Sequence, residues 1–356
     1  MDKKIKEILE YGVMAPSGDN SQPWKFVISD TILKIYNLPD KDNPYLNFMQ
    51  SGSLVAHGAL LKNIEIASSK VGLISKIKLF PSSNDPNLIS EISFENTSPA
   101  QQIDPLFEFI SKRVTNRRPY ENKKFSEKEK VLLEEAGVFG DVGLHFIIDP
   151  ENKKRAGAAS SMVEIIILEN KLLHSYLFKD VMWSEKQERK EKHGLYIKTM
   201  EFNPIQKFLF KLASNKLLMH IAVKLHFSYF IAKQDALLYA SGSTMCLFTL
   251  KKISLENFVK LGMKMQEIWL KATSLGLASQ PVTAILFLGF KLQNDQNDQI
   301  LSQKHKNIAF ESCKNIFSAF SLNSEEIPFI MFRIGHAKDP SARSSRKEPI
   351  IKIENK

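Results

Sequence analysis

The sequence has few cysteines and no long uninterrupted apolar run. Its 356 residues include two cysteines, Cys246 and Cys313, which form neither a metal-ligand spacing nor a disulfide framework. We therefore expect a reducing, cytoplasmic compartment. Residues 1–11 mix lysine and glutamate with isoleucine and leucine, a pattern typical of an amphipathic helix and not of a signal peptide.

Common nucleotide and metal motifs are also missing. The sequence contains no G-x-G-x-x-G after a predicted strand and no phosphate-loop lysine motif. His220 and His226 lie six residues apart, so they do not share a helix face as i, i+4 metal ligands would. Glu164 and Glu169 have no partner at metal-ligand spacing. No metal site is predicted.

Basic residues outnumber acidic ones, which gives a formal net charge of +10. The lysines are spread along the chain and are mostly mixed with acidic residues, which favours solvated faces. Because no nucleic-acid motif accompanies this charge, we expect a small-molecule substrate and no nucleic-acid partner.

Hydrophobic periodicity predicts an α+β protein with interspersed helices and strands. Helices are expected at 3–14, 51–71, 106–114, 126–136, 152–173, 255–275 and 302–320, and strands at 24–28, 32–36, 76–80, 88–94, 143–148, 285–289 and 329–334. Ser126 and Glu129 form a capping box at the start of one of these helices.

Residues 174–235 differ from the rest of the chain. The stretch 205–232 is apolar but carries a lysine or histidine every few residues, which excludes a transmembrane span. The favoured interpretation is one or two amphipathic helices packed on the body. The alternative is a mobile lid, or a surface that contacts a membrane or a partner.

An internal repeat links two predicted helices. Residues 58–73 align without gaps on residues 262–277, so that Gly58 coincides with Gly262 and Gly72 with Gly276. Chance similarity between two amphipathic helices is one explanation. The other is duplication, with two similar halves packed like a fused dimer.

The loop Ala15-Pro-Ser-Gly-Asp-Asn-Ser-Gln-Pro-Trp24 is the first candidate site. Pro16 stiffens the chain and Gly18 permits unusual backbone angles. Ser17 and Asn20 add a hydroxyl and an amide, which together with free N–H groups match the alternating donors and acceptors of a flavin edge. From the residues alone, a capped turn leading into a strand is an equal alternative.

Two arginine-rich segments are the second candidate. Arg113, Thr115 and Arg117 combine guanidinium groups with a hydroxyl, as do Arg343 and Arg346 in the basic tail. Arginine binds phosphate through a bidentate fork. Each segment alone is more typical of solvated surface, but together with the loop they favour a phosphate-bearing aromatic cofactor.

These motifs resemble the FMN-dependent nitroreductase family. The loop resembles that family's Ala-Pro-Ser-x-x-Asn-x-Gln-Pro-Trp signature, and residues 113–117 resemble its Arg-x-Ser-x-Arg motif with Thr115 in place of serine. Gln280 and Pro281 match the loop beside the reactive flavin face. The run Phe332-Arg333-Ile-Gly335, with Arg343 and Arg346, resembles the family's last strand and basic tail.

The order of the motifs resembles the single-chain, Acg-like branch of this family. The resemblance implies a nitroreductase-like fold with antiparallel-rich mixed sheets flanked by helices, duplicated as a fused pseudo-dimer. Residues 1–100 are expected to be one half, and residues 101–356 the other, with 174–235 as a helical lid insertion. Residues 136–143 lack the loop signature in the second half, so we expect one composite site, in a monomer or homodimer.

The resemblance also assigns roles. One FMN per chain is implied, with NADH or NADPH as transient reductant and nitro compounds or quinones as substrates, reduced in ping-pong order through flavin N5. The implied FMN-binding residues are Pro16, Ser17, Gly18, Asn20, Arg113, Thr115, Arg117, Gln280, Pro281, Arg343 and Arg346, with Arg117 as the catalytic cation near N1 and O2. The alternative function is a flavoprotein that sequesters FMN or senses redox state beneath a closed lid; membrane contact through 205–232 is a minor hypothesis.

Overall fold

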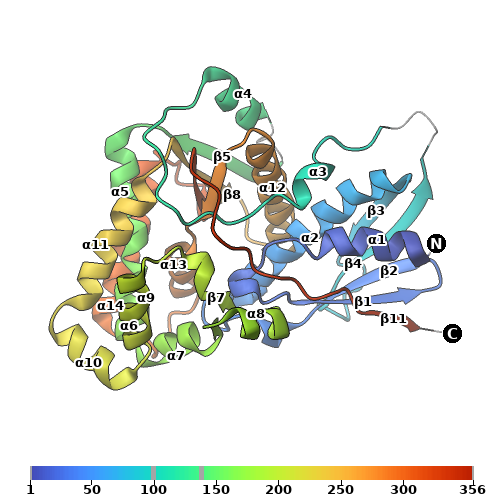
Figure 1. The fold of residues 1–356 in the computed structure, drawn as a ribbon. Coiled ribbons are helices and arrows are strands. Elements are labelled where there is room, and N and C mark those ends of the chain that lie inside the picture. Colours follow the sequence, from blue (N-terminus) through green and yellow to red (C-terminus); the bar gives the residue numbers. More distant parts are fainter. Residues whose placement is uncertain (1, 98–101, 136–139, 355–356) are drawn as a thin grey trace. The chain divides into compact units, whose positions relative to one another are not determined.

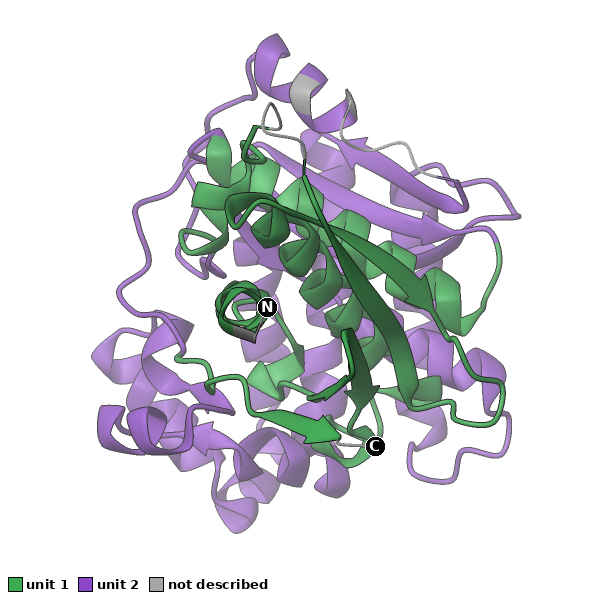
Figure 2. Ribbon diagram, turned by 90° about the vertical axis from the view of Figure 1, so that its right-hand side faces the viewer, with its two compact units in different colours: residues 1–113, 252–274, 345–356 green, residues 114–251, 275–344 purple. Residues whose placement is uncertain are grey.

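The computed structural model describes residues 2–97, 102–135 and 140–354, which form two compact units (Figure 2). Unit 1 comprises Met1–Arg113, Lys252–Ser274 and Ser345–Lys356, and unit 2 comprises Val114–Lys251 and Leu275–Ser344. Each unit is therefore built from separate stretches of chain. The expected boundary between sequence halves at residues 100 and 101 lies outside the described residues and stays a prediction.

Unit 1 combines an antiparallel-rich sheet with helices (Figure 1). Its helices are α1 (Asp2–Gly12), η1 (Gly18–Asn20), η2 (Pro39–Lys41), η3 (Phe48–Gln50), α2 (Ser51–Lys70), α3 (Phe107–Ile110) and α12 (Leu255–Ser274), and its strands are β1 (Trp24–Ser29), β2 (Ile32–Asn37), β3 (Leu73–Leu79), β4 (Leu88–Asn96) and β11 (Ile351–Glu354). The strand order is β11-β1-β2-β4-β3. Only β11 is parallel to its neighbour, with Phe26 opposite Ile351.

The two repeat helices, α2 and α12, pack against each other in unit 1. A Cβ atom on Gly58 would lie 2.0 Å from the carbonyl oxygen of Val259, and one on Gly262 would lie 2.0 Å from that of Val55. These glycines coincide in the repeat, and so do the two valines. The contact is therefore reciprocal, as in an isologous dimer interface.

Polar contacts along the same helix pair repeat this reciprocity. Gln266 donates from Nε2 to Asn63 Oδ1 at 2.8 Å, while Lys62 lies 3.9 Å from Glu267. In the repeat Lys62 aligns with Gln266 and Asn63 with Glu267, so each contact is the counterpart of the other. This arrangement supports duplication over chance similarity.

Unit 2 contains a second sheet and most of the helices. Its helices are α4 (Glu127–Glu135), α5 (Pro150–Ser161), α6 (Val163–Glu169), α7 (Lys171–Lys179), α8 (Glu185–Glu191), η4 (Ile197–Met200), α9 (Pro204–Ala213), α10 (Lys216–Lys224), α11 (Phe227–Ala240), α13 (Ala284–Asn294) and α14 (Gln303–Ala319). Its strands are β5 (Val142–Ile147), β6 (Val181–Met182), β7 (Leu195–Tyr196), β8 (Thr244–Leu250), β9 (Ala278–Pro281) and β10 (Ile327–Gly335). The four-stranded sheet β5-β8-β10-β9 is antiparallel throughout. The expected α+β class with antiparallel-rich mixed sheets and flanking helices is confirmed.

The strand expected at 285–289 is wrong, because these residues lie in helix α13. A short apolar run cannot distinguish a buried strand from a buried helix. Gly289, read as the end of a strand, is instead a packing residue: its Cβ would lie 2.3 Å from Cys313 Sγ on α14.

Helix boundaries differ at two further places. The helix expected over 152–173 is divided into α5, α6 and α7, and Asn170 Oδ1 accepts from the N–H groups of Leu172 and Leu173 at the start of α7. The helix expected over 106–114 is confined to α3. The fully buried strand β8 has no counterpart among the predicted elements.

Candidate functional site

The loop between α1 and β1 has an unusual backbone. Asp19, Asn20 and Gln22 have positive φ angles of 43°, 58° and 52°, which are uncommon for residues other than glycine. The Gln22 N–H donates to Ser17 Oγ at 3.0 Å, closing the loop internally. Such strained angles persist only where surrounding contacts impose them, and they cluster at ligand sites.

Helix α2 fixes the end of this loop through His57. The imidazole Nε2 lies 3.1 Å from the Pro23 carbonyl oxygen and 3.2 Å from Asn37 Oδ1, so a proton on Nε2 serves both acceptors. Burial lowers the pKa of His57 to about 4, although the Pro23 bond opposes this shift. The ring is therefore neutral near pH 7 and acts as a fixed donor.

Two arginines hold the start of the loop. Arg113 donates from Nη2 to the Met14 carbonyl at 2.8 Å, and its guanidinium lies 4.5 Å from the ring centre of Trp269 on α12. Arg346 donates from Nε to the neighbouring Ala15 carbonyl at 3.3 Å. Each guanidinium uses part of its five-donor fork for these contacts.

The C-terminal tail lies against the middle of the loop. Asn20 donates from Nδ2 to the Ser345 carbonyl at 3.0 Å, and the Lys347 N–H donates to Gln22 Oε1 at 2.8 Å. The structure therefore brings together the loop, Arg113 and the tail; that these residues bind a cofactor stays a prediction.

A partly buried carboxyl group, that of Asp42, lies beside Gly18. A Cβ atom at this glycine would lie 2.9 Å from Asp42 Oδ1, so the loop can approach only without a side chain there. Burial, aided by the charge of Asp19, raises the pKa of Asp42 to about 7, against hydrogen bonds from Asn43 and Ser53 that lower it. Asp42 is absent from the predicted site.

In unit 2, Thr115 and Asn116 of the arginine motif pair with Ser279 of strand β9. Thr115 forms a parallel β-bridge with Ser279, and the Asn116 N–H donates to the Ser279 carbonyl at 3.0 Å. The Ser279 hydroxyl is buried without a hydrogen-bond partner among the described residues. A buried orphan hydroxyl beside the predicted motif is a donor that a ligand can satisfy.

The predicted catalytic cation, Arg117, contacts the segment 174–235. Its Nη1 lies 3.3 Å from the Thr199 carbonyl oxygen and 3.4 Å from Thr199 Oγ1. The next residue, Arg118, forms a 3.3 Å ion pair with Glu201, which also accepts from the Ser341 N–H. The segment around η4 is thus fixed to both arginines.

Strand β9 carries Gln280 and Pro281, paired with Arg333 and Phe332 of β10. Gln280 Oε1 accepts from Arg333 Nε at 2.8 Å. Arg333 is fully buried, and its guanidinium lies 4.0 Å from the ring centre of Tyr120. The Gln280 amide oxygen is therefore oriented by a buried cation.

A buried acidic cluster lies deeper in unit 2. Burial, aided by the negative charge of Asp235, raises the pKa of Glu164 to about 8, and a hydrogen bond with Tyr239 opposes this. Burial also raises the pKa of Asp235 to about 6, although Arg333 lowers it. The buried carboxyl of Glu164 therefore favours its protonated form.

The predicted site residues divide between the two units. Unit 1 contains Pro16, Ser17, Gly18, Asn20, Arg113 and Arg346, and unit 2 contains Thr115, Arg117, Gln280, Pro281 and Arg343. Sequence reasoning missed His57, Asp42, Trp269 and Arg333 as supporting residues. The one signal available was Arg333, a charged residue inside the apolar run of β10.

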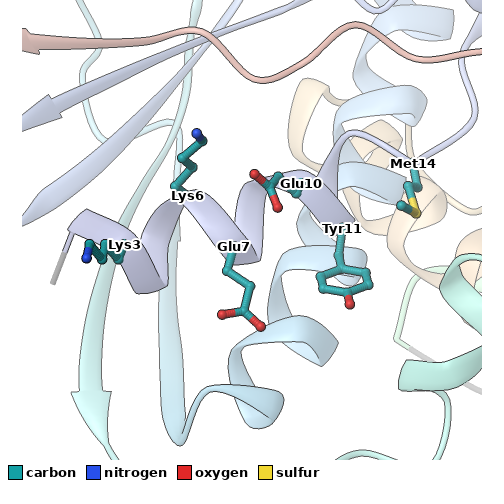
Figure 3. Close-up of a pocket in the computed structure, with 6 residues that line it drawn as sticks. All are labelled: Lys3, Lys6, Glu7, Glu10, Tyr11 and Met14. Atoms are coloured by element: carbon teal, nitrogen blue, oxygen red, sulfur yellow. The ribbon is translucent and has the colours of Figure 1, made fainter.

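A separate hollow runs along α1, lined by Lys3, Lys6, Glu7, Glu10, Tyr11 and Met14 (Figure 3). Its lining mixes both charges and includes none of the predicted site residues.

Among residues 2–97, 102–135 and 140–354, no group of three or more His, Cys, Asp and Glu side chains could hold a metal ion. Within the same ranges, no helix is long and apolar enough to cross a membrane.

Comparisons with known proteins give sequence relatives over part of the chain. The "Putative NAD(P)H nitroreductase acg" of Mycobacterium tuberculosis is 27% identical over 180 residues, which are 49% of this chain and 53% of that protein. An uncharacterized protein of the same organism is 20% identical over 341 residues, 96% of this chain and 47% of its own length. The chain thus spans about half the length of the curated relatives it matches. No family model matches it.

Solved structures give a weaker likeness. A nitroreductase with bound FMN from Bacteroides fragilis has a TM-score of 0.34 and 10% identity, covering 68% of this chain and 94% of that one. A nitroreductase with bound FMN from Desulfitobacterium hafniense has a TM-score of 0.36 and 11% identity, covering 69% and 96%. The sequence relatives confirm the resemblance read from the motifs: over 49% of its length this chain is similar to the putative NAD(P)H nitroreductase acg.

Proposed function

We propose that this chain is an FMN-binding, NAD(P)H-dependent oxidoreductase that reduces nitro compounds or quinones in ping-pong order. The observation that carries the proposal is the strained loop 15–24, fixed by α2, by two arginines and by the tail. Similarity to a putative NAD(P)H nitroreductase supports the reductant and the reaction class. When bound, FMN supplies the atom that accepts and donates hydride.

The residues present fit this cofactor. Ser279, which bridges to Thr115 of the arginine motif, provides a buried hydroxyl with an unused hydrogen-bonding capacity among the described residues. In the proposal, Pro16, Ser17, Gly18 and Asn20 hold the isoalloxazine edge, and Gln280 and Pro281 lie near N5. Arg113, Thr115, Arg343 and Arg346 hold the phosphate, and Arg117 stabilises negative charge at N1 and O2.

The test uses the purified full chain and added FMN. Protein passed through a desalting column should retain one FMN per chain, and anaerobic mixing with NADH or NADPH should bleach the visible flavin band. A chain that stays colourless after incubation with FMN would overturn the cofactor assignment. Bound FMN that neither nicotinamide reduces would overturn the enzyme assignment while leaving binding intact.

A second candidate function is sequestration of FMN or redox sensing without turnover. It is favoured by the contacts of Thr199 with Arg117 and of Glu201 with Arg118, because the segment 174–235 thereby contacts the proposed catalytic cation. A lid fixed in this way could exclude the nicotinamide. Dithionite then reduces the bound FMN whereas NADH and NADPH do not.

A further inference from the structure

Helices α9, α10 and α11 of unit 2 are apolar on two sides. Their inner sides pack in the unit, where Ala213 and Met219 are buried with Leu168, and Phe210 contacts Phe178 and Trp183. A helix that buries one apolar stripe normally presents a polar face to solvent. These helices instead present a second apolar stripe.

This outer stripe follows helical spacing. Its members are large, exposed apolar side chains on the three helices and at the C-cap of α10: Ile205, Phe208, Leu212, Leu217, Leu218, Ile221, Leu225, Tyr229, Phe230 and Leu237. Ile205 is 71% exposed, Leu217 70% and Leu225 77%. Because α10 packs beside both α9 and α11, these exposed side chains lie on neighbouring helices, and large exposed apolar surfaces mark interaction sites.

Basic rows run beside the apolar rows. On α10, Lys216, His220 and Lys224 repeat every four residues, one position before Leu217, Ile221 and Leu225. On α9, Lys207 and Lys211 stand in the same relation to Phe208 and Leu212. Lysine stems can lie along apolar surface while their charged ends reach an anionic layer.

The charge around this stripe has one sign. Residues 202–234 contain five lysines and no aspartate or glutamate. Helix α8 shows the contrast, because its lysines and arginine alternate with glutamates and Arg189 pairs with Glu185. A second copy would bring like charges together at this face, so self-association is disfavoured by charge.

We propose that the outer face of α9–α11 binds an anionic lipid surface. The apolar stripe enters the headgroup boundary and the basic rows contact lipid phosphates, so the helices lie on the bilayer rather than span it. This surface function goes beyond the proposed oxidoreductase activity and does not depend on it.

Flotation of the full chain with lipid vesicles tests the proposal. The chain should float with vesicles of phosphatidylcholine and phosphatidylglycerol and much less with phosphatidylcholine alone, and raised salt should weaken binding. Lys207→Gln with Lys211→Gln should weaken it by roughly 25-fold, at about fivefold per lysine. The matched control is Lys186→Gln with Lys190→Gln on α8, which has the same spacing and exposure and should leave binding unchanged.

The apolar rows have their own variant. Leu217→Gln with Leu225→Gln should abolish flotation. The control is Ile148→Gln, at an exposed isoleucine elsewhere in unit 2, which should not affect flotation. Unchanged circular dichroism establishes that each variant is folded. Equal binding to neutral vesicles, or none to anionic ones, overturns the proposal. Self-association that Leu217→Gln and Leu225→Gln remove, without vesicle binding, assigns the face to a second copy instead.

Discussion

The two parts of the predicted site are supported by different kinds of structure. In unit 1, the loop 15–24 is fixed by a buried histidine on α2 and by Arg113 stacked on α12. In unit 2, Arg117 and Arg118 are held by Thr199 of the short 3-10 helix η4 and by Glu201 at its end. The contrast teaches that one part depends on two long helices of the core, and the other on a short helix packed in a smaller hydrophobic cluster.

The largest loss of stability is expected at the contact between α2 and α12 in unit 1. Gly58→Ala places a Cβ against the Val259 carbonyl oxygen, and because backbone cannot move aside, we expect a loss of about 3 kcal/mol in the free energy of unfolding. Urea unfolding measures it. Gly289→Ala in α13 is the control, since its Cβ meets the end of the Cys313 side chain and should cost less. Equal losses would remove the distinction between the two positions.

The second prediction concerns the affinity of the loop 15–24 for FMN. Ser17→Ala with Asn20→Ala removes the bonds to the Gln22 N–H and the Ser345 carbonyl, and we expect FMN affinity to fall by at least about tenfold. Fluorescence titration of FMN measures this. Ser82→Ala, which removes a hydroxyl accepting from Asn84 in another turn, should leave affinity unchanged. Unaltered affinity in the double variant would contradict the loop's role.

A smaller effect is expected in unit 2. Glu201→Gln weakens the ion pair with Arg118, so the segment around η4 should open more often and flavin reduction by NADPH should become about fivefold faster. Anaerobic stopped-flow absorbance measures the rate. Glu185→Gln weakens the exposed pair with Arg189 on α8 and serves as the control. A slower or unchanged rate in Glu201→Gln would show that this contact does not restrict the reductant.

The last expected effect is a pH dependence in unit 1. Because the pKa of Asp42 is raised from 3.8 to about 7, the folded chain holds this proton more tightly than the unfolded chain. Asp42 therefore makes the free energy of unfolding decrease as pH rises from about 4 to about 7. Asp42→Asn should reduce this slope and the exposed Asp40→Asn should not, as measured by urea unfolding at several pH values. An unchanged slope in Asp42→Asn would contradict the burial of a neutral carboxyl.

Local signals predicted much of the fold. Turn residues, caps and periodicity placed the strands β1 and β2 and the helices α2 and α12 within a few residues. They failed at α13, where Phe287 and Phe290 pack on Phe329 of β10. Tertiary packing decides the conformation of such a short apolar run.

The candidate site was predicted less completely than the fold. The motifs named the residues that carry guanidinium, hydroxyl and amide groups, but nothing in one sequence shows that His57 reaches Pro23 or that Asp42 lies beside Gly18. Those contacts join residues from separate elements, so they depend on the tertiary fold. The parallel strand β11 was missed for the same reason, since its partner is β1.

The crossing of α2 and α12 has a consequence for biosynthesis. Most residues of α2 are buried, yet the glycine that fits against its Gly58 is Gly262 of α12. At ordinary translation rates the nascent chain waits on the order of ten to forty seconds between these two helices. During that interval the face of α2 that receives α12 has no partner helix, so the core of unit 1 can close only after residue 262 has been synthesised.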